Sequence, residues 1–333
     1  MAYMALVLLL IFIAIMLLGI PVGFGMGALT VIAFELLGGD LSMIPQKMFA
    51  GIDTYTYVCI LLFILSADIM SVGGITNAIV VFCEKLVGHI KGGLAHVNVL
   101  ASMLFAGLSG SAAADAAGLG PIEIKMMTDG GYDKEFSSCL TAASAIIGPI
   151  IPPSNIMIIY AGCVGTVSVG KMFLAGAIPG ILLGIAYMIF CYWISVKRKY
   201  PCRKTRATWK EIGHATWETL PALLLPIIIM GTITLGICTA TESSAIAVIY
   251  STIVAACKKN LSIKSFCRAC IRSAKAAANV LFIIAISSAM AWAVTTLGVA
   301  QALTNFCVAY INNKIVFLLF VNVLLLLIGM LLD

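Results

Sequence analysis

Long apolar segments recur along the whole chain, and short stretches that carry most of its charged residues separate them. Runs of about 17 to 25 apolar residues are long enough to cross a ~30 Å hydrocarbon core as α-helices. Two runs, 1–37 and 218–256, are too long for one crossing, and we expect each to fold into two spans, at Gly19–Pro21 and near Thr239. Single spans are expected at 57–82, 136–164, 169–196 and 276–303, and a last segment, 315–333, is expected to enter the membrane from outside. The pattern predicts an all-α polytopic membrane protein.

Composition and charge agree with this class and set the topology. Hydrophobic residues make up 62% of the chain and charged residues 10%, against roughly a quarter charged in soluble proteins. The net charge of +6 comes mainly from 197–210 and 258–275, which lie between apolar runs. Because basic loops stay cytoplasmic, this distribution places the N-terminus outside. We read the charge as a topology signal or a contact with anionic lipid, and not as a nucleic-acid site.

Two polar, helix-breaking stretches interrupt the apolar pattern. Gly107–Gly118 is rich in glycine, serine and alanine with one aspartate, and Gly148–Asn155 carries a double proline. Such backbone is tolerated at membrane depth only where protein buries it or a cavity hydrates it. We therefore expect a re-entrant hairpin at 94–126 with its tip at Ser109–Ser111, and a broken helix at 136–164.

The order of spans and breaks predicts an internal repeat. The turn near residue 20 corresponds to a turn near residue 240, so 1–196 and 218–333 read as inverted-topology repeats, an architecture of secondary transporters. The second repeat stops at its hairpin tip, so we expect the chain to be a truncated form of a longer protein. Between the repeats, 197–217 is either a basic interfacial helix or a solvated cytoplasmic loop.

The hairpin tip carries the first candidate ligands. Hydroxyls and freed carbonyls at Ser109, Gly110 and Ser111 are hard oxygen ligands of the kind that alkali and alkaline-earth cations prefer. Asp115 is costly in lipid, which favours a place on a transport pathway. The alternatives are helix packing by small residues and capping of the second hairpin leg by Asp115.

The double proline supplies the second set of candidates. Pro152 and Pro153 lack backbone N–H groups, which frees carbonyls from Gly148 onward, and Ser154 and Asn155 add side-chain oxygens. The exposed ends of the half-helices favour a cation at one end and a carboxylate at the other. The alternative is a simple proline kink.

Two further candidates lie in the second half. Thr241 is in the outside turn with Thr239 and Glu242, where ordinary capping explains the residues about as well as function does. Asp333 corresponds by repeat symmetry to the first hairpin tip.

The motifs that carry these candidates resemble the large membrane subunit (DctM-like, M subunit) of tripartite ATP-independent periplasmic (TRAP) transporters. The resemblance covers essentially the whole chain. Its segments are Leu18–Val22, Val87–Val99, Leu104–Ser111, Ala114–Asp115, Gly148–Ser154, Phe173–Gly180 and Thr241–Glu242.

The resemblance implies a sodium-coupled importer of the elevator type in the bacterial inner membrane. Its expected substrate is a small organic acid: a dicarboxylate, a keto acid or sialic acid. Its expected partners are a small four-helix membrane subunit (DctQ-like) and a periplasmic substrate-binding protein (DctP-like). It implies no cofactor apart from the coupling ion Na⁺. The sodium ligands would be Ser109, Gly110, Ser111, Pro153 and Ser154.

Two other classes of function compete with this interpretation. A single-component carrier of the same fold would need no binding protein. A membrane-embedded enzyme would need a catalytic motif, yet the sequence has neither Gly-x-Ser-x-Gly nor His-Glu-x-x-His, and it has no phosphate-binding loop for an ATP-driven pump. Asp68 is the only other carboxylate we expect within the membrane in the first half, at the end of the third span. The sequence therefore favours a transporter and not an enzyme.

Overall fold

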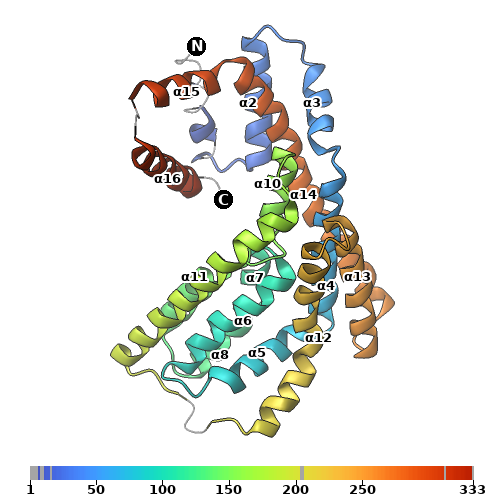
Figure 1. Ribbon diagram of the computed structural model, residues 1–333, viewed down its shortest axis with the longest axis vertical. Helices are drawn as coiled ribbons and strands as arrows, with labels where there is room; N and C mark the ends of the chain where they lie inside the picture. The colour runs from blue at the N-terminus through green and yellow to red at the C-terminus, as the bar shows by residue number, and fades with distance from the viewer. Residues whose placement is uncertain (1–6, 8–10, 16, 203–205, 311–312, 332–333) are drawn as a thin grey trace. The chain divides into compact units, whose positions relative to one another are not determined.

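The computed structural model describes residues 7, 11–15, 17–202, 206–310 and 313–331, and all regular secondary structure in these ranges is helical (Figure 1). Five of the described helices are long and apolar enough to cross a membrane. They are Tyr55–Val72, Val169–Arg198, Trp209–Thr234, Ala240–Cys257 and Ile263–Thr296. The prediction of an all-helical polytopic membrane protein is confirmed.

The chain divides into two compact units, and the division falls within helix α14 (Ile263–Thr296). The first unit joins 1–53 to 280–333. It contains α2 (Val22–Leu36), α3 (Met43–Ile52), the end of α14, α15 (Val299–Tyr310) and α16 (Lys314–Leu331).

Aromatic and aliphatic side chains hold the first unit together. Leu29 and Phe34 of α2 are buried against the end of α14, where the rings of Phe34 and Trp292 stack with centroids 4.9 Å apart. The Lys47 ammonium of α3 lies 5.3 Å from the Trp292 ring centre, a cation–π distance. The turn expected at Gly19–Pro21 is present, since Gly19 is left-handed and α2 begins directly after Pro21.

The second unit, 54–279, holds both polar breaks. Its helices are η1 (Tyr55–Tyr57), α4 (Val58–Val72), α5 (Ile75–Val87), α6 (Gly93–Ser109), α7 (Ala112–Gly118), α8 (Gly120–Asp129), α9 (Lys134–Ala145), α10 (Asn155–Val164), α11 (Val169–Arg198), α12 (Trp209–Thr234), α13 (Ala240–Cys257) and the start of α14. α4 packs along α13, and their facing hydroxyls, Ser66 and Ser251, share a buried hydrogen bond of 3.1 Å.

The span expected at 57–82 is two helices in the structure. α4 ends at Val72, Gly74 adopts a left-handed φ of 76°, and α5 then starts in a new direction to pack on α6 and α12. Adjacent glycines end helices readily, since the left-handed residue satisfies the last carbonyls without a Cβ penalty. Asp68 consequently lies near the end of α4, about one turn before Val72, and Ser273 donates to it at 2.8 Å.

The stretch 209–217 is the first part of α12 and not a separate helix. A capping box between Thr208 and Glu211 starts α12, which then continues through Pro221 and Pro226. Trp209 and Trp217 are exposed on this part of the helix. Amphipathic indoles in such a place are typical of the membrane–water interface.

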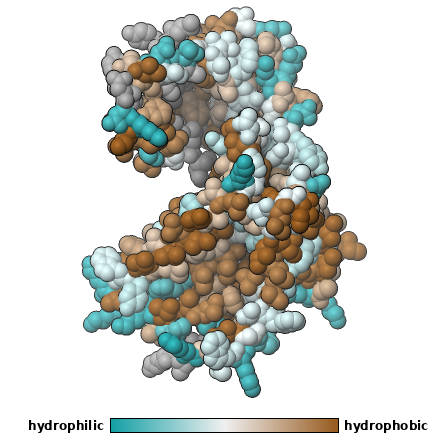
Figure 2. Space-filling model, viewed as in Figure 1, coloured by the Kyte–Doolittle hydropathy of each residue, from teal (hydrophilic) through white to brown (hydrophobic). Residues whose placement is uncertain are grey.

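The outer surface of α11 is apolar over most of its length. Its exposed side chains include Ile178, Leu182 and Ile189, while Lys197 and Arg198 lie in its last turn. Figure 2 shows the same gathering of apolar residues over this helix. An exposed apolar face bounded by charges fits contact with lipid.

Candidate functional site

Glycine 110 forms the tip between α6 and α7. α6 ends there with a left-handed φ of 61°, and α7 begins after Ser111. A Cβ at this position would overlap the carbonyl oxygen of Pro153. Both the backbone conformation and the close approach of the second break therefore require glycine.

The second break separates α9 from α10. Pro152 and Pro153 are buried, and the missing N–H groups of adjacent prolines prevent one continuous helix. Ser154 then caps α10: its Oγ accepts a hydrogen bond from the Met157 amide at 3.3 Å and donates to the Pro149 carbonyl.

A backbone hydrogen bond joins the two breaks. The amide of Asn155 donates to the carbonyl oxygen of Gly110 at 3.3 Å. The structure thus brings together the tip residues 109–111 and the proline residues 152–155, which the sequence identified separately.

Asp115 lies beside this junction. Its side chain is buried, Ser109 Oγ donates to its Oδ1, and its Oδ2 has no hydrogen-bond partner among the described residues. A Cβ on Gly148 would lie 2.7 Å from that Oδ2. The side-chain cap of α7 is Ser111, whose Oγ accepts from the Ala114 amide at 3.4 Å. Ser111 and not Asp115 therefore provides the side-chain cap of α7.

A buried polar network continues from this site between α6 and α9. Asn98 donates to Thr141 Oγ1 at 2.7 Å and accepts from Ser144 Oγ at 2.8 Å, and Ser102 donates to Ser144 at 3.1 Å. All four side chains are buried. Buried polar groups that are mutually bonded specify one packing arrangement, because an alternative would leave them unpaired.

Sequence reasoning missed one buried carboxyl in this unit. Glu123 of α8 has no exposed surface, and neither of its oxygens has a hydrogen-bond partner among the described residues. Glu123 is thus a buried carboxyl that the sequence analysis did not single out beside Asp115 and Asp68. The available signal was an acidic residue inside the hairpin segment 94–126, next to apolar neighbours.

The remaining candidates are not part of the junction as described. Thr239 and Glu242 form a capping box at the start of α13, which supports the capping interpretation of that turn. The Thr241 hydroxyl donates to the Tyr55 carbonyl at 3.4 Å. Asp333 lies outside the described residues.

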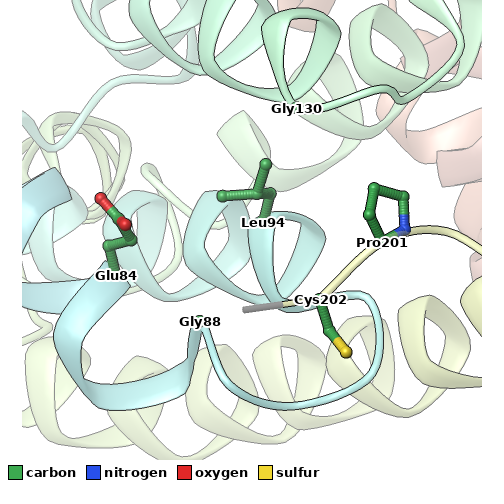
Figure 3. A pocket seen from close by; sticks show the side chains of 6 residues that line it. All are labelled: Glu84, Gly88, Leu94, Gly130, Pro201 and Cys202. Atoms are coloured by element: carbon green, nitrogen blue, oxygen red, sulfur yellow. The ribbon is translucent and has the colours of Figure 1, made fainter. Parts of the chain in front are cut away.

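A small cavity of about 200 Å³ lies at the other end of α6 (Figure 3). Leu94 at the start of α6 helps to line it, and the 17 residues of α6 place this end about 25 Å from the tip, at 1.5 Å per residue. The other lining residues are Glu84, Gly88, Gly130, Pro201 and Cys202. The candidate site therefore rests on the contact between the two breaks and not on this cavity.

Discontinuous helices whose buried polar ends meet inside a polytopic helical protein are typical of one class, the secondary membrane transporters. The family model for the DctM component of tripartite ATP-independent periplasmic transporters matches residues 9–333. The chain belongs to this family of transporter permeases, which are not enzymes.

Three relatives illustrate the similarity. The chain is 37% identical over 327 residues to the sialic acid TRAP transporter permease SiaT of Haemophilus influenzae, with 98% of this chain and 53% of the relative covered. It is 39% identical over 314 residues to the large permease SiaM of Vibrio cholerae, covering 93% and 73%. It is 36% identical over 304 residues to the C4-dicarboxylate large permease DctM of Pseudomonas aeruginosa, covering 91% and 70%. The chain thus spans about half of the first relative and about three quarters of the second.

Proposed function

We propose that this chain forms the sodium-coupled translocation pathway of a TRAP transporter that imports a small organic acid across the bacterial inner membrane. The observation that carries the proposal is the contact between Gly110 and Asn155, which places two oxygen-rich helix breaks side by side inside one unit. Relatives are named for sialic acid, C4-dicarboxylate and 2,3-diketo-L-gulonate. These three compounds share a carboxylate, whereas isethionate, for which another relative is named, carries a sulfonate. All are anions, and we expect this substrate to present a carboxylate.

The proposed sodium site uses the oxygens around the junction. Ser109, Ser111 and Ser154 supply hydroxyls, and Gly110 and Pro153 supply carbonyls. A hydroxyl that donates one hydrogen bond keeps lone pairs for a cation. Asp115 adds a negative charge whose second oxygen has no partner among the described residues, and a cation would offset the cost of burying it.

The coupling of substrate transport to sodium binding follows from this geometry. A sodium ion held by both breaks would tie α6 and α7 to α10, and the substrate carboxylate would then meet a preformed positive charge. Gly148 and Pro152 shape the break, and Asn155 offers a side-chain amide to the substrate. Movement of the loaded unit as a body, in an elevator-type cycle, would carry both solutes across.

The assembly proposed for the complete protein has three parts. By family membership, the large permease would work with a small four-helix membrane subunit and a periplasmic binding protein, with its N-terminus in the periplasm.

Inverted repeats would place Asp333 and Thr241 in the second half of the site. A complete transporter should therefore take up substrate only when the binding protein is supplied, and uptake by the large subunit alone would favour a single-component carrier.

Sodium titrations of uptake test the site itself. In the complete transporter reconstituted in liposomes, Ser111→Ala, Ser154→Ala and Asp115→Asn should each raise the sodium concentration for half-maximal uptake about tenfold, which corresponds to about 1.4 kcal/mol of lost ion binding. Because Ser111 and Ser154 are also helix caps, Thr239→Ala is the matched control: it removes a cap of the same kind on α13. An equal shift in the control, or unaltered sodium dependence in all three variants, would refute the assignment.

A further inference from the structure

Glu123 is a buried acid with no ion-pair partner in the described part of the chain. It has no exposed surface, neither side-chain oxygen accepts a hydrogen bond, and no described Lys, Arg or His forms an ion pair with it. Burying an ionised carboxylate without partners costs far more than burying the neutral acid. The neutral, protonated form is therefore the one that this environment accommodates.

The groups around Glu123 disfavour its negative charge further. Asp115 on α7 and Cys83 on α5 both interact with it electrostatically, and both are groups that become negative when they lose a proton. On α6, His96 is engaged with the Gly92 carbonyl at 2.9 Å. The other titratable side chains of α8 and α9 are exposed: Lys125, Asp129, Lys134, Glu135 and Cys139.

The surroundings fit a proton better than a metal cation. A cation needs several oxygen ligands at once, whereas the neighbouring polar groups already bond one another: Ser102 donates to Ser144, and Ser144 to Asn98. A proton needs only one acceptor oxygen. The Ser102 hydroxyl lies within hydrogen-bonding reach of Glu123. Because this hydroxyl donates to Ser144, it can accept a hydrogen bond from the protonated acid.

We propose that Glu123 is a proton-binding site of the second unit, loaded and emptied during the transport cycle and distinct from the sodium ligands at the helix breaks. The proton comes from water and returns to water, so no other reactant is needed. The proposal goes beyond the sodium-coupled function, and its binding part can be tested without transport.

Infrared spectroscopy of the purified full-length large subunit tests proton binding directly. The wild type should show the C=O stretch of a buried protonated carboxyl, sensitive to deuterium and lost as the pH rises, and Glu123→Gln should remove it. Glu135→Gln is the matched control, because Glu135 is exposed on the adjacent α9. Identical carboxyl spectra in the wild type and the Glu123→Gln variant at every pH would overturn the proposal, whatever ion drives transport.

Uptake measurements test whether Glu123 gains and loses its proton during the transport cycle. Glu123→Gln mimics the protonated acid, so uptake by the complete transporter should fall about tenfold and lose its dependence on pH, with the sodium half-saturation unchanged. An unchanged pH profile would show a permanently neutral structural group, and a shifted sodium dependence with the wild-type pH profile would show a cation ligand; both overturn the proposal. If the glutamine variant does not assemble, Glu123→Asp should shift the pH profile, and an unshifted profile would overturn it as well.

Discussion

The backbone amide of Asn155 donates a hydrogen bond to the carbonyl oxygen of Gly110, with 3.3 Å between the two atoms. Asn155 opens α10 and Gly110 closes α6, so the bond joins two helix ends that are distant in the sequence. Groups freed at a helix break have no partner in hydrocarbon. Each break therefore supplies a hydrogen-bond partner for a backbone group of the other. Disruption of one break should consequently destabilise the other.

Gly110→Ala tests this dependence. Its left-handed φ of 61° would strain alanine by about 1–2 kcal/mol, and the added Cβ would overlap the Pro153 carbonyl and push the breaks apart. We expect the free energy of unfolding to fall by about 3 kcal/mol in total, at the upper end of common single substitutions. Denaturant or thermal unfolding of the purified protein in detergent measures it.

Gly165→Ala is the matched control for this variant. Gly165 is also left-handed, with a φ of 71°, but a Cβ there meets no described atom within 4 Å. It should show the backbone strain without the overlap. Equal losses in the two variants would mean that the approach of Pro153 to Gly110 adds nothing to stability.

Much of the site could be predicted because its signals are local. Adjacent prolines at 152 and 153 break a helix in any surroundings, and a glycine between two serines at 109–111 permits a tight reversal. Hydropathy located most of the long apolar helices, although it joined α4 and α5 into one span. Backbone chemistry of this kind is carried by a few neighbouring residues, so the sequence displays it directly.

The burial of Glu123 could not be predicted in this way. An acid two residues before Lys125 reads as part of a charged surface, and only the packing of α8 on α9 shows that one side chain is inside and the other outside. The extent of α12 was missed for a related reason. Its capping box at Thr208 starts the helix ahead of the apolar run on which the prediction relied.

Asn98→Ala should be strongly destabilising. The change leaves Thr141 and Ser144 without the buried partner that each contacts, at 2.7 and 2.8 Å. With about 1–3 kcal/mol for each unsatisfied buried group, we expect a loss of about 2–4 kcal/mol in the free energy of unfolding. Thr252→Val is the control, because among the described residues the Thr252 hydroxyl bonds the Val248 carbonyl of its own helix alone, and it should change stability by about 0.5 kcal/mol or less. Similar losses in both variants would contradict a special role for the network.

Acid should weaken the contact between Asp133 and the end of α11. Hydrogen bonds from the Tyr200 hydroxyl and then from Arg198, at 2.8 Å, lower the pKa of Asp133 below its ordinary value of 3.8. A lowered pKa stabilises the fold above the ordinary value, and this contribution is lost as the pH falls through the folded-state pKa. Asp133→Asn should remove that part of the acid dependence.

The measurement is the melting temperature as the pH falls from neutral through 3.8. Because Asp133 is exposed, the difference should be small, and Glu135→Gln on the same helix serves as the control. The prediction fails if the Asp133→Asn variant and the wild type lose stability in parallel over the whole range.

Cysteine labelling should place both basic loops on the cytoplasmic side. Lys199 and Lys259 are exposed residues just beyond the ends of α11 and α13, and each lies in a basic loop that should remain cytoplasmic. Ala240 begins α13 at the opposite end of that helix. α12 has 26 residues and is about 39 Å long at 1.5 Å per residue, enough to cross the membrane between these positions.

The variants are Lys199→Cys, Lys259→Cys and Ala240→Cys on a background in which the 11 native cysteines are replaced. A membrane-impermeant thiol reagent should label the first two only from the cytoplasm and the third only from the periplasm. Detergent-solubilised protein, in which all three should react, controls for intrinsic reactivity. Labelling of all three from one side would mean that α12 and α13 do not cross the membrane. It would also contradict the inverted-repeat arrangement, because the second repeat depends on that pair of crossings.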